Sequence, residues 1–434
     1  MFLCRAVNFY PDRQSSKILQ AITVIFYFCC LVAFAWNFVD PEEALKIFTF
    51  STILSIVIII GNFKHLLTNK RLLILPISIL AFGLLQVIWV QIFKQPDSPF
   101  TGAYRSYQSA GKTMIFSGFV IAALSTNPLS SPKIFKIVNS IIILLALLLY
   151  GWISYKYYAV DSVNIIRGRI SLGNQPATGT AYALTFMAIL TCQALFNICK
   201  RTTIIFYFIH FTLSYFIITL TQTRAAILLY PFLNIGLFLL HYRYNRLILL
   251  RSIIAFTILG LIALLPLKSV LEKRYVAFQA DMRAYSNDNS KTSIGARFAM
   301  QHAGFIAGKT DPFFGQSLEQ RSTTIRAAAK TDPSLRGALQ FLNVHLHNEL
   351  IDTFSLKGAL GVILLLSCYI AAGYTAFIQR NIVLFIITIT ITIYSLSDLL
   401  LYAKHGALNC ILALCIALMM MPRIPGDSVY DQKS

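Results

Sequence analysis

Long blocks of apolar residues, separated by short polar and charged segments, run along almost the whole chain. A helix of about 20 apolar residues spans a bilayer and satisfies its own backbone hydrogen bonds there, which irregular chain cannot do. The pattern predicts about twelve such helices, at residues 18–38, 47–63, 72–93, 113–129, 137–154, 177–198, 204–221, 225–241, 247–267, 356–378, 382–400 and 406–421. We therefore expect an all-α polytopic membrane protein.

The composition agrees with this pattern. The 434 residues are 57% hydrophobic and only 12% charged, whereas a soluble domain carries about 25% charged residues. Mean hydropathy is +0.67, which excludes a conventional soluble enzyme and a disordered chain. The eight cysteines lie in or beside apolar segments and form no Cys-x-x-Cys pair. A disulfide framework or a structural zinc site is therefore not expected.

The net charge of +20 indicates membrane topology, because the basic residues lie mostly in short loops between apolar segments. With the N-terminus in the cytoplasm, 16 Lys and Arg fall on the cytoplasmic side and nine in the short loops opposite. The remaining 12 lie between Lys268 and Lys357, in a loop too long for this rule to count. Both termini are expected in the cytoplasm, and the long loop on the outer side.

The chain is expected to divide at this long loop. Residues 1–267 hold the first nine spans, residues 268–355 form the loop, residues 356–421 hold the last three spans, and residues 422–434 form a cytoplasmic tail. Within the loop, Asp332-Pro333 has the pattern of a helix N-cap followed by proline at the first helical position. It predicts a short helix through Arg336 and Leu339.

No nucleotide-binding motif is evident in the sequence. The stretch Gly304–Thr310 has three residues between its glycines where a phosphate-binding loop needs four, and no strand pattern precedes it. No Asp-x-Asp pair that could hold a metal on a nucleotide sugar is present. We therefore expect neither ATP nor another cofactor.

Arginines placed where outer loops meet apolar segments are the first candidate for chemistry. They are Arg167 and Arg169 before Gly173, Arg224 in a very short turn, Arg297 and Arg336. Each could simply extend its charge to water or pair with a lipid headgroup. Arg224 argues against that explanation, because positive charge in a short outer loop opposes the topology rule. A guanidinium fork binds phosphate oxygens bidentately, which favours an anionic ligand.

The second candidate is His345-Leu346-His347-Asn348, directly before the span at 356–378. The two histidines could hold a metal, although no third ligand is evident, or could cap the span. A histidine at the membrane–water boundary beside arginines is best suited to act as a base, because its pKa lies near the operating pH. We expect one histidine to do so and the other to orient it. On a helix, residues two apart would point in different directions.

Four segments together carry a resemblance to a known family. They are Val344–Glu349 with Gly358 nine residues after Asn348 and then Gly361, Thr221–Ala225, Ser293 to Arg297 with Pro312 and Gly315 behind it, and Arg167 to Gly173. The pattern over residues 70–410 resembles the bacterial O-antigen ligases, and among them the enterobacterial lipopolysaccharide ligases.

The resemblance implies a metal-independent, inverting glycosyltransferase with a GT-C-like fold in the bacterial inner membrane. It implies transfer of a polysaccharide from undecaprenyl diphosphate to the lipid A-core oligosaccharide at the periplasmic face. Arg224 and Arg297 would bind the donor diphosphate, with Arg169 and Arg336 completing the basic pocket. His347 would be the catalytic base, and His345, Asn348 and Arg167 would be secondary.

Two other functions are compatible with parts of this pattern. An O-antigen polymerase would share the donor and the membrane fold, but polymerases tend to divide their soluble residues between two sizeable loops. A lipid-linked oligosaccharide transporter would place ionisable residues inside its spans. Here the predicted spans hold almost none, and Asp398 and Lys404 near the end of the eleventh are the main exceptions.

Overall fold

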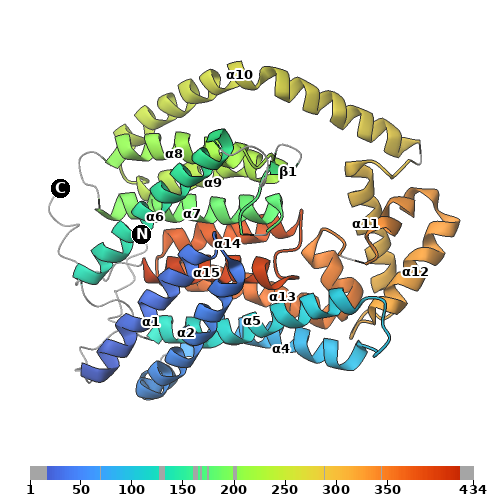
Figure 1. Ribbon diagram of the computed structural model, residues 1–434, viewed down its shortest axis with the longest axis horizontal. Helices are drawn as coiled ribbons and strands as arrows, with labels where there is room; N and C mark the ends of the chain where they lie inside the picture. Colours follow the sequence, from blue (N-terminus) through green and yellow to red (C-terminus); the bar gives the residue numbers. More distant parts are fainter. Residues whose placement is uncertain are drawn as a thin grey trace.

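The computed structural model describes residues 17–68, 70–126, 132–159, 165–166, 169–173, 175–198, 203–287, 289–343 and 345–420. These residues are almost entirely helical (Figure 1). The α-helices are α1 (Lys17–Trp36), α2 (Pro41–Gly61), α3 (Phe63–Thr68), α4 (Ile74–Phe93), α5 (Thr101–Thr126), α6 (Pro132–Ala159), α7 (Ala177–Ile198), α8 (Thr203–Thr219), α9 (Arg224–His241), α10 (Arg246–Ser286), α11 (Ser293–Gly308), α12 (Leu318–Thr331), α13 (Glu349–Ile378), α14 (Ile382–Ser395) and α15 (Lys404–Met419). Two 3-10 helices, η1 (Lys70–Leu73) and η2 (Pro333–Phe341), and one antiparallel hairpin of β1 (Ile165–Ile166) and β2 (Arg169–Ile170) complete the described elements.

The all-α class is confirmed, and each of the predicted spans overlaps a helix. Within the described residues, seven helical segments are long and apolar enough to cross a membrane, and α8, α14 and α15 are shorter apolar helices. Several predicted boundaries were wrong. Helices begin at Pro41 and Thr101, upstream of the predicted 47 and 113, and α14 ends at Ser395, before the predicted 400. Asp40 accounts for the first of these starts, because its carboxylate caps α2 ahead of Pro41.

The core of the bundle forms around α7 and α15. Both helices are buried over most of their length, and they lie in the middle of the bundle with α14 (Figure 1). Close helix packing is possible where small residues face each other. Between α4 and α5, a Cβ on Gly83 would lie 2.8 Å from the carbonyl oxygen of Gly111. Backbone contact therefore replaces side-chain packing at that crossing.

A separate lobe is built from α11, α12 and η2 (residues 293–341) and packs on the first turns of α13. It is reached through α10, a helix of 41 residues that arches along the bundle (Figure 1). The lobe has its own apolar core, which includes Ala299, Met300, Ile325, Leu335 and Leu346. Helices α10 and α13 both run across the boundaries expected near residues 268 and 356.

Local sequence signals explain how the lobe folds. The side chain of Ser317 accepts a hydrogen bond from the backbone N–H of Gln320, whose side chain accepts one from the N–H of Ser317, so α12 begins with a capping box. Asp332 caps η2 ahead of Pro333, which confirms the predicted short helix and shows that it is of the 3-10 type. The glycines 304 and 308 lie inside α11, which confirms that they do not form a phosphate-binding loop.

Helix α13 is kinked at Gly358, whose φ of +59° lies in the left-handed region. A Cβ on Gly358 would lie 2.5 Å from the carbonyl carbon of Phe313, and a Cβ on Gly315 (φ +82°) would lie 2.1 Å from the carbonyl oxygen of Leu356. The two glycines therefore allow the segment between α11 and α12 to press its backbone against the kink.

Substituting Gly358 should destabilise the protein. In Gly358→Ala the methyl group meets backbone atoms and the residue is held at positive φ, which alone costs about 1–2 kcal/mol. We expect a lower midpoint of thermal unfolding in detergent. Gly373→Ala is the matched control in the same helix, because no atom lies within 4 Å of its added Cβ. Equal midpoints for the two variants would contradict the steric explanation.

Candidate active site

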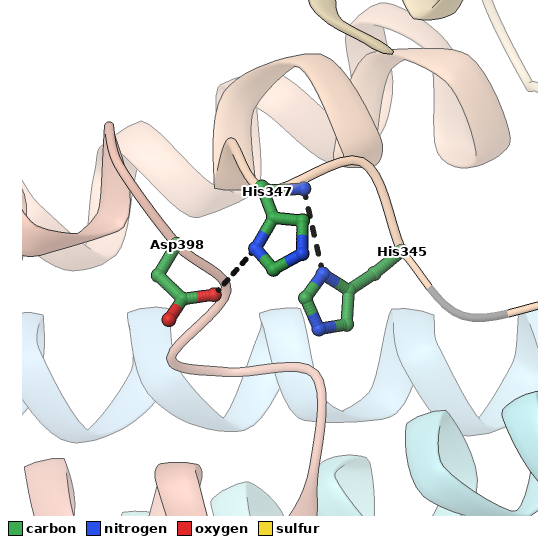
Figure 2. A group of neighbouring side chains, drawn as sticks. All are labelled: His345, His347 and Asp398. Carbon is green, nitrogen blue, oxygen red and sulfur yellow. Dashed lines mark hydrogen bonds and ion pairs between the residues drawn. The ribbon is translucent and has the colours of Figure 1, made fainter. Parts of the chain in front are cut away.

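His347 and Asp398 form a hydrogen-bonded pair between two irregular segments that flank helices of the bundle (Figure 2). The Nδ1 atom of His347 lies 3.1 Å from Oδ1 of Asp398, although 51 residues separate the two in sequence. Asp398 is 8% exposed, and it lies after the last residue of α14. The pair therefore depends on how the two segments are held against each other.

The backbone around His347 is strained and is not helical. His347 has a φ of +50°, a conformation that is uncommon outside glycine and often marks functional sites. Helix α13 begins only at Glu349, and Asn348 is its N-cap, accepting hydrogen bonds from the N–H groups of Leu350 and Ile351. The residue that caps α13 is therefore Asn348, and not one of the histidines.

The expectation that the two histidines point in different directions was wrong, because it assumed a helix. Their ring centroids are 4.4 Å apart, and the N–H of His347 donates to Nδ1 of His345 at 3.4 Å (Figure 2). The ring of His345 also packs edge-on against Tyr402, 5.0 Å away. His345 is therefore a direct neighbour of the His347–Asp398 pair.

The protonation states follow from this arrangement. Burial alone would raise the pKa of Asp398, but the hydrogen bond and the charge of His347 outweigh it and hold that pKa below its usual value. Burial, together with the nearby His347, lowers the pKa of His345 to about 4. An ionised carboxylate can only accept a hydrogen bond, so Nδ1 of His347 donates to Asp398, and Nε2 is the ring nitrogen that does not bind the carboxylate.

Two acidic side chains on the first turn of α13 hold the segments in place, and burial raises the pKa of one of them, Glu349, to about 8. Oδ1 of Asp352 accepts hydrogen bonds from Arg321 at 2.9 Å and from the N–H of Leu346 at 3.2 Å. Oε2 of Glu349 accepts from the N–H groups of Leu400 and Leu401, at 2.6 and 3.0 Å. Asp352 therefore positions the histidine segment, and Glu349 positions the segment of Asp398.

The Arg321–Asp352 ion pair is buried, with both side chains 1% exposed. Tyr107 of α5 donates a further hydrogen bond to Asp352, and Lys357 lies with its Nζ 4.3 Å from the centroid of the Tyr107 ring. Removing one partner of a buried pair leaves an uncompensated charge, which costs about 3–5 kcal/mol. These contacts join the lobe, α5 and α13 directly beneath the histidines.

The arginines expected from the sequence lie in different parts of the protein. Arg169 donates from Nε to the carbonyl oxygen of Thr221 at 3.0 Å and from Nη2 to Oγ1 of Thr223 at 3.2 Å. It therefore braces the turn that carries Arg224, the exposed first residue of α9. Gln222 in the same turn has a φ of +52°. The hairpin and this turn lie at the same end of the bundle as the lobe (Figure 1).

Arg297 is exposed on α11. The hydroxyl of Tyr182 on α7 interacts electrostatically with both Arg297 and Asp398. Arg336 is exposed on η2, and within the described residues no contact brings it to the histidines. Arg167 lies outside the described residues.

The same side chains could also hold a metal ion. One ligand atom each from His345, His347 and Asp398 lies within 4.8 Å of the others, and imidazole and carboxylate are suitable ligands for zinc. The sequence showed no third ligand because Asp398 is remote along the chain. One signal was available, since Asp398 is the only acidic residue between Asp352 and Asp427.

The fold and the site together define a polytopic helical membrane protein with a histidine–carboxylate pair between the segments that flank α13 and α14. Comparisons with known proteins place the chain in a family. The family model described as O-antigen ligase matches residues 209–366. A protein of Escherichia coli (strain K12) named O-antigen ligase is 32% identical over 410 residues, which cover 94% of this chain and 95% of that protein.

The chain therefore belongs to the O-antigen ligase family. An uncharacterized protein of Haemophilus influenzae is also 32% identical, over 120 residues that cover 27% of this chain and 30% of that protein.

The low pKa of His345 predicts how stability depends on pH. The unfolded chain binds a proton at His345 near pH 6.5 and the folded protein only near pH 4, so acidification between these values favours unfolding, by at most about 1.4 kcal/mol per pH unit. His345→Gln should flatten the fall of the unfolding midpoint between pH 6.5 and 5. His302→Gln, at an exposed histidine of α11, should leave the slope unchanged. An unaltered slope in His345→Gln would contradict this protonation state.

Proposed function

We propose that this protein transfers a polysaccharide from undecaprenyl diphosphate to the lipid A-core oligosaccharide at the periplasmic face of the inner membrane. It would be an inverting, metal-independent glycosyltransferase of GT-C-like fold, acting in lipopolysaccharide biosynthesis. The proposal rests on one observation above all, the His347–Asp398 pair, in a chain of the O-antigen ligase family. Both termini would lie in the cytoplasm, and the lobe in the periplasm.

In this mechanism His347 removes the proton from an acceptor hydroxyl. The acceptor oxygen bonds to the anomeric carbon of the donor from the face opposite the diphosphate, so the configuration inverts. The bond between that carbon and the diphosphate oxygen breaks, the diphosphate leaves with the electron pair, and the proton resides on Nε2 of His347. Asp398 stabilises the imidazolium that forms. No ATP is required, because the diphosphate is itself the activated leaving group.

The arginines would stabilise the charge that develops on the diphosphate. Arg224 and Arg297 are exposed and so can reach a ligand, and a guanidinium fork matches phosphate oxygens bidentately. Arg169 already uses two of its donors on the turn of Arg224. Its positive charge and remaining donors would also stabilise the diphosphate. Arg336 would lie at the edge of the same basic pocket, and Arg167 would support it.

The lipopolysaccharide profile of a strain that lacks this protein tests the function. A ligase predicts core oligosaccharide without attached polymer, together with accumulated lipid-linked polymer. A core bearing a single repeat unit would instead indicate a polymerase. A strain in which lipid-linked material fails to reach the periplasm would indicate a transporter.

Arg224→Ala should abolish attachment of the polymer without lowering the protein level. Arg224→Lys should restore it only partly, because lysine keeps the charge but loses the bidentate fork. The attached polymer can be measured on gels of lipopolysaccharide from complemented strains. Arg105→Ala, at another exposed arginine near an end of the bundle, is the control and should remain active. Full activity of Arg224→Ala would remove Arg224 from the site.

His347→Ala should lower the rate of transfer by about 10²–10⁴, the usual contribution of a positioned acid–base group. Donor binding should persist, because the arginines provide those contacts. The rate is measured with purified protein, lipid-linked donor and acceptor in detergent, both without and with excess EDTA. The wild-type rate should be unchanged by EDTA. His345→Ala should be less damaging than His347→Ala, and His302→Ala should be neutral.

Two outcomes would count against this assignment. Inactivation by EDTA that a divalent ion reverses would show that His345, His347 and Asp398 hold a metal. A larger loss in His345→Ala than in His347→Ala would move the role of base to His345.

A further inference from the structure

The segment Asp311–Phe314, between α11 and α12, carries two adjacent aromatic side chains that the protein leaves uncovered. Phe313 is 68% exposed and Phe314 is 74% exposed. In a soluble lobe, two neighbouring exposed phenylalanines would be an unfavourable apolar surface in water. Their position relative to the membrane-spanning part of α13 gives them a different explanation.

The kink at Gly358 divides α13 into two parts with different surroundings. Before the kink, α13 packs against the lobe, since a Cβ on Gly308 of α11 would lie 2.3 Å from the ring of Phe354. After it, residues 359–378 form 20 helical residues, a length of roughly 30 Å, which equals the thickness of the hydrocarbon core. This part exposes Leu360, Ile363 and Ile370, by 40%, 63% and 69%. The kink therefore lies at the edge of the bilayer.

The Asp311–Phe314 segment is fixed to that edge by backbone hydrogen bonds. The N–H of Ala359 donates to the carbonyl oxygen of Pro312 at 2.7 Å, and the N–H of Leu360 donates to that of Phe313 at 3.2 Å. The segment thus supplies acceptors that the kinked helix lacks. Leu360 is the first of the exposed apolar residues on this part of α13. Phe313 and Phe314 therefore lie beside the start of its exposed apolar surface.

We propose that Phe313 and Phe314 insert into the bilayer at the boundary between the glycerol groups and the acyl chains, and anchor the lobe to the membrane surface. Aromatic side chains are enriched at that depth. Lys309 at the end of α11, with its Nζ 4.6 Å from the ring of Phe305, is placed to meet lipid phosphate. The anchor fixes the height of the lobe, and with it the height of the histidine segment that packs against it. The inference concerns a lipid contact and does not depend on the proposed transfer reaction.

Quenching of tryptophan fluorescence by brominated lipids tests the proposal. Phe313→Trp and Phe314→Trp are conservative changes at exposed positions, and each is compared with the wild type, whose three tryptophans give the background. Ala327→Trp, at an exposed position of the polar helix α12, is the matched control. Each protein is placed in phospholipid nanodiscs that hold a single chain, so that a second copy cannot cover the segment. The bromine is placed either near the glycerol end or near the methyl end of the acyl chain.

We expect the added tryptophan at 313 or 314 to lose about half its emission or more with bromine near the glycerol end, and less with bromine near the methyl end, as for side chains at the interface. Ala327→Trp should be unaffected by either lipid. Quenching at 313 and 314 that does not exceed that of Ala327→Trp would overturn the proposal. Stronger quenching by the deep bromine would also overturn the assigned depth.

Discussion

The candidate active site depends on the first turn of α13, where Glu349 and Asp352 each hold a different irregular segment by its backbone N–H groups. Neither segment has regular secondary structure that could fix its shape. A carboxylate that accepts several hydrogen bonds fixes a loop without covering it. His347 can therefore meet the buried Asp398 at 3.1 Å and still keep 25% of its own side chain exposed.

This arrangement also explains why charges are buried beside the membrane. Arg321 compensates the charge of Asp352 and ties it to α12, so the lobe and the membrane helix share one ion pair. The strain at His347, with its φ of +50°, persists because the hydrogen bonds on both sides of it determine the backbone. The same hydrogen bonds thus stabilise the fold and fix the geometry of His347.

The helices and the two motifs were predictable from the sequence, because apolar length and residue type are local properties. The hydrogen bond of His347 with Asp398 was not, since the two residues are 51 positions apart in sequence. Nor was the bracing of the Arg224 turn by Arg169, which depends on where the hairpin packs. The histidines were misjudged because a left-handed residue replaced the assumed helix, and the enrichment of histidine in that conformation is too small to signal the change.

The substitution Asp398→Asn tests whether Asp398 fixes His347 as the base. The amide keeps the size of the carboxylate but removes the charge that sets the protonation of Nδ1 and stabilises the imidazolium. With purified protein, lipid-linked donor and acceptor, the rate of transfer should fall by about 10²–10⁴, while binding of the donor and the unfolding midpoint change little. A rate within a few-fold of the wild type would show that the carboxylate of Asp398 does not prepare His347 to act as the base.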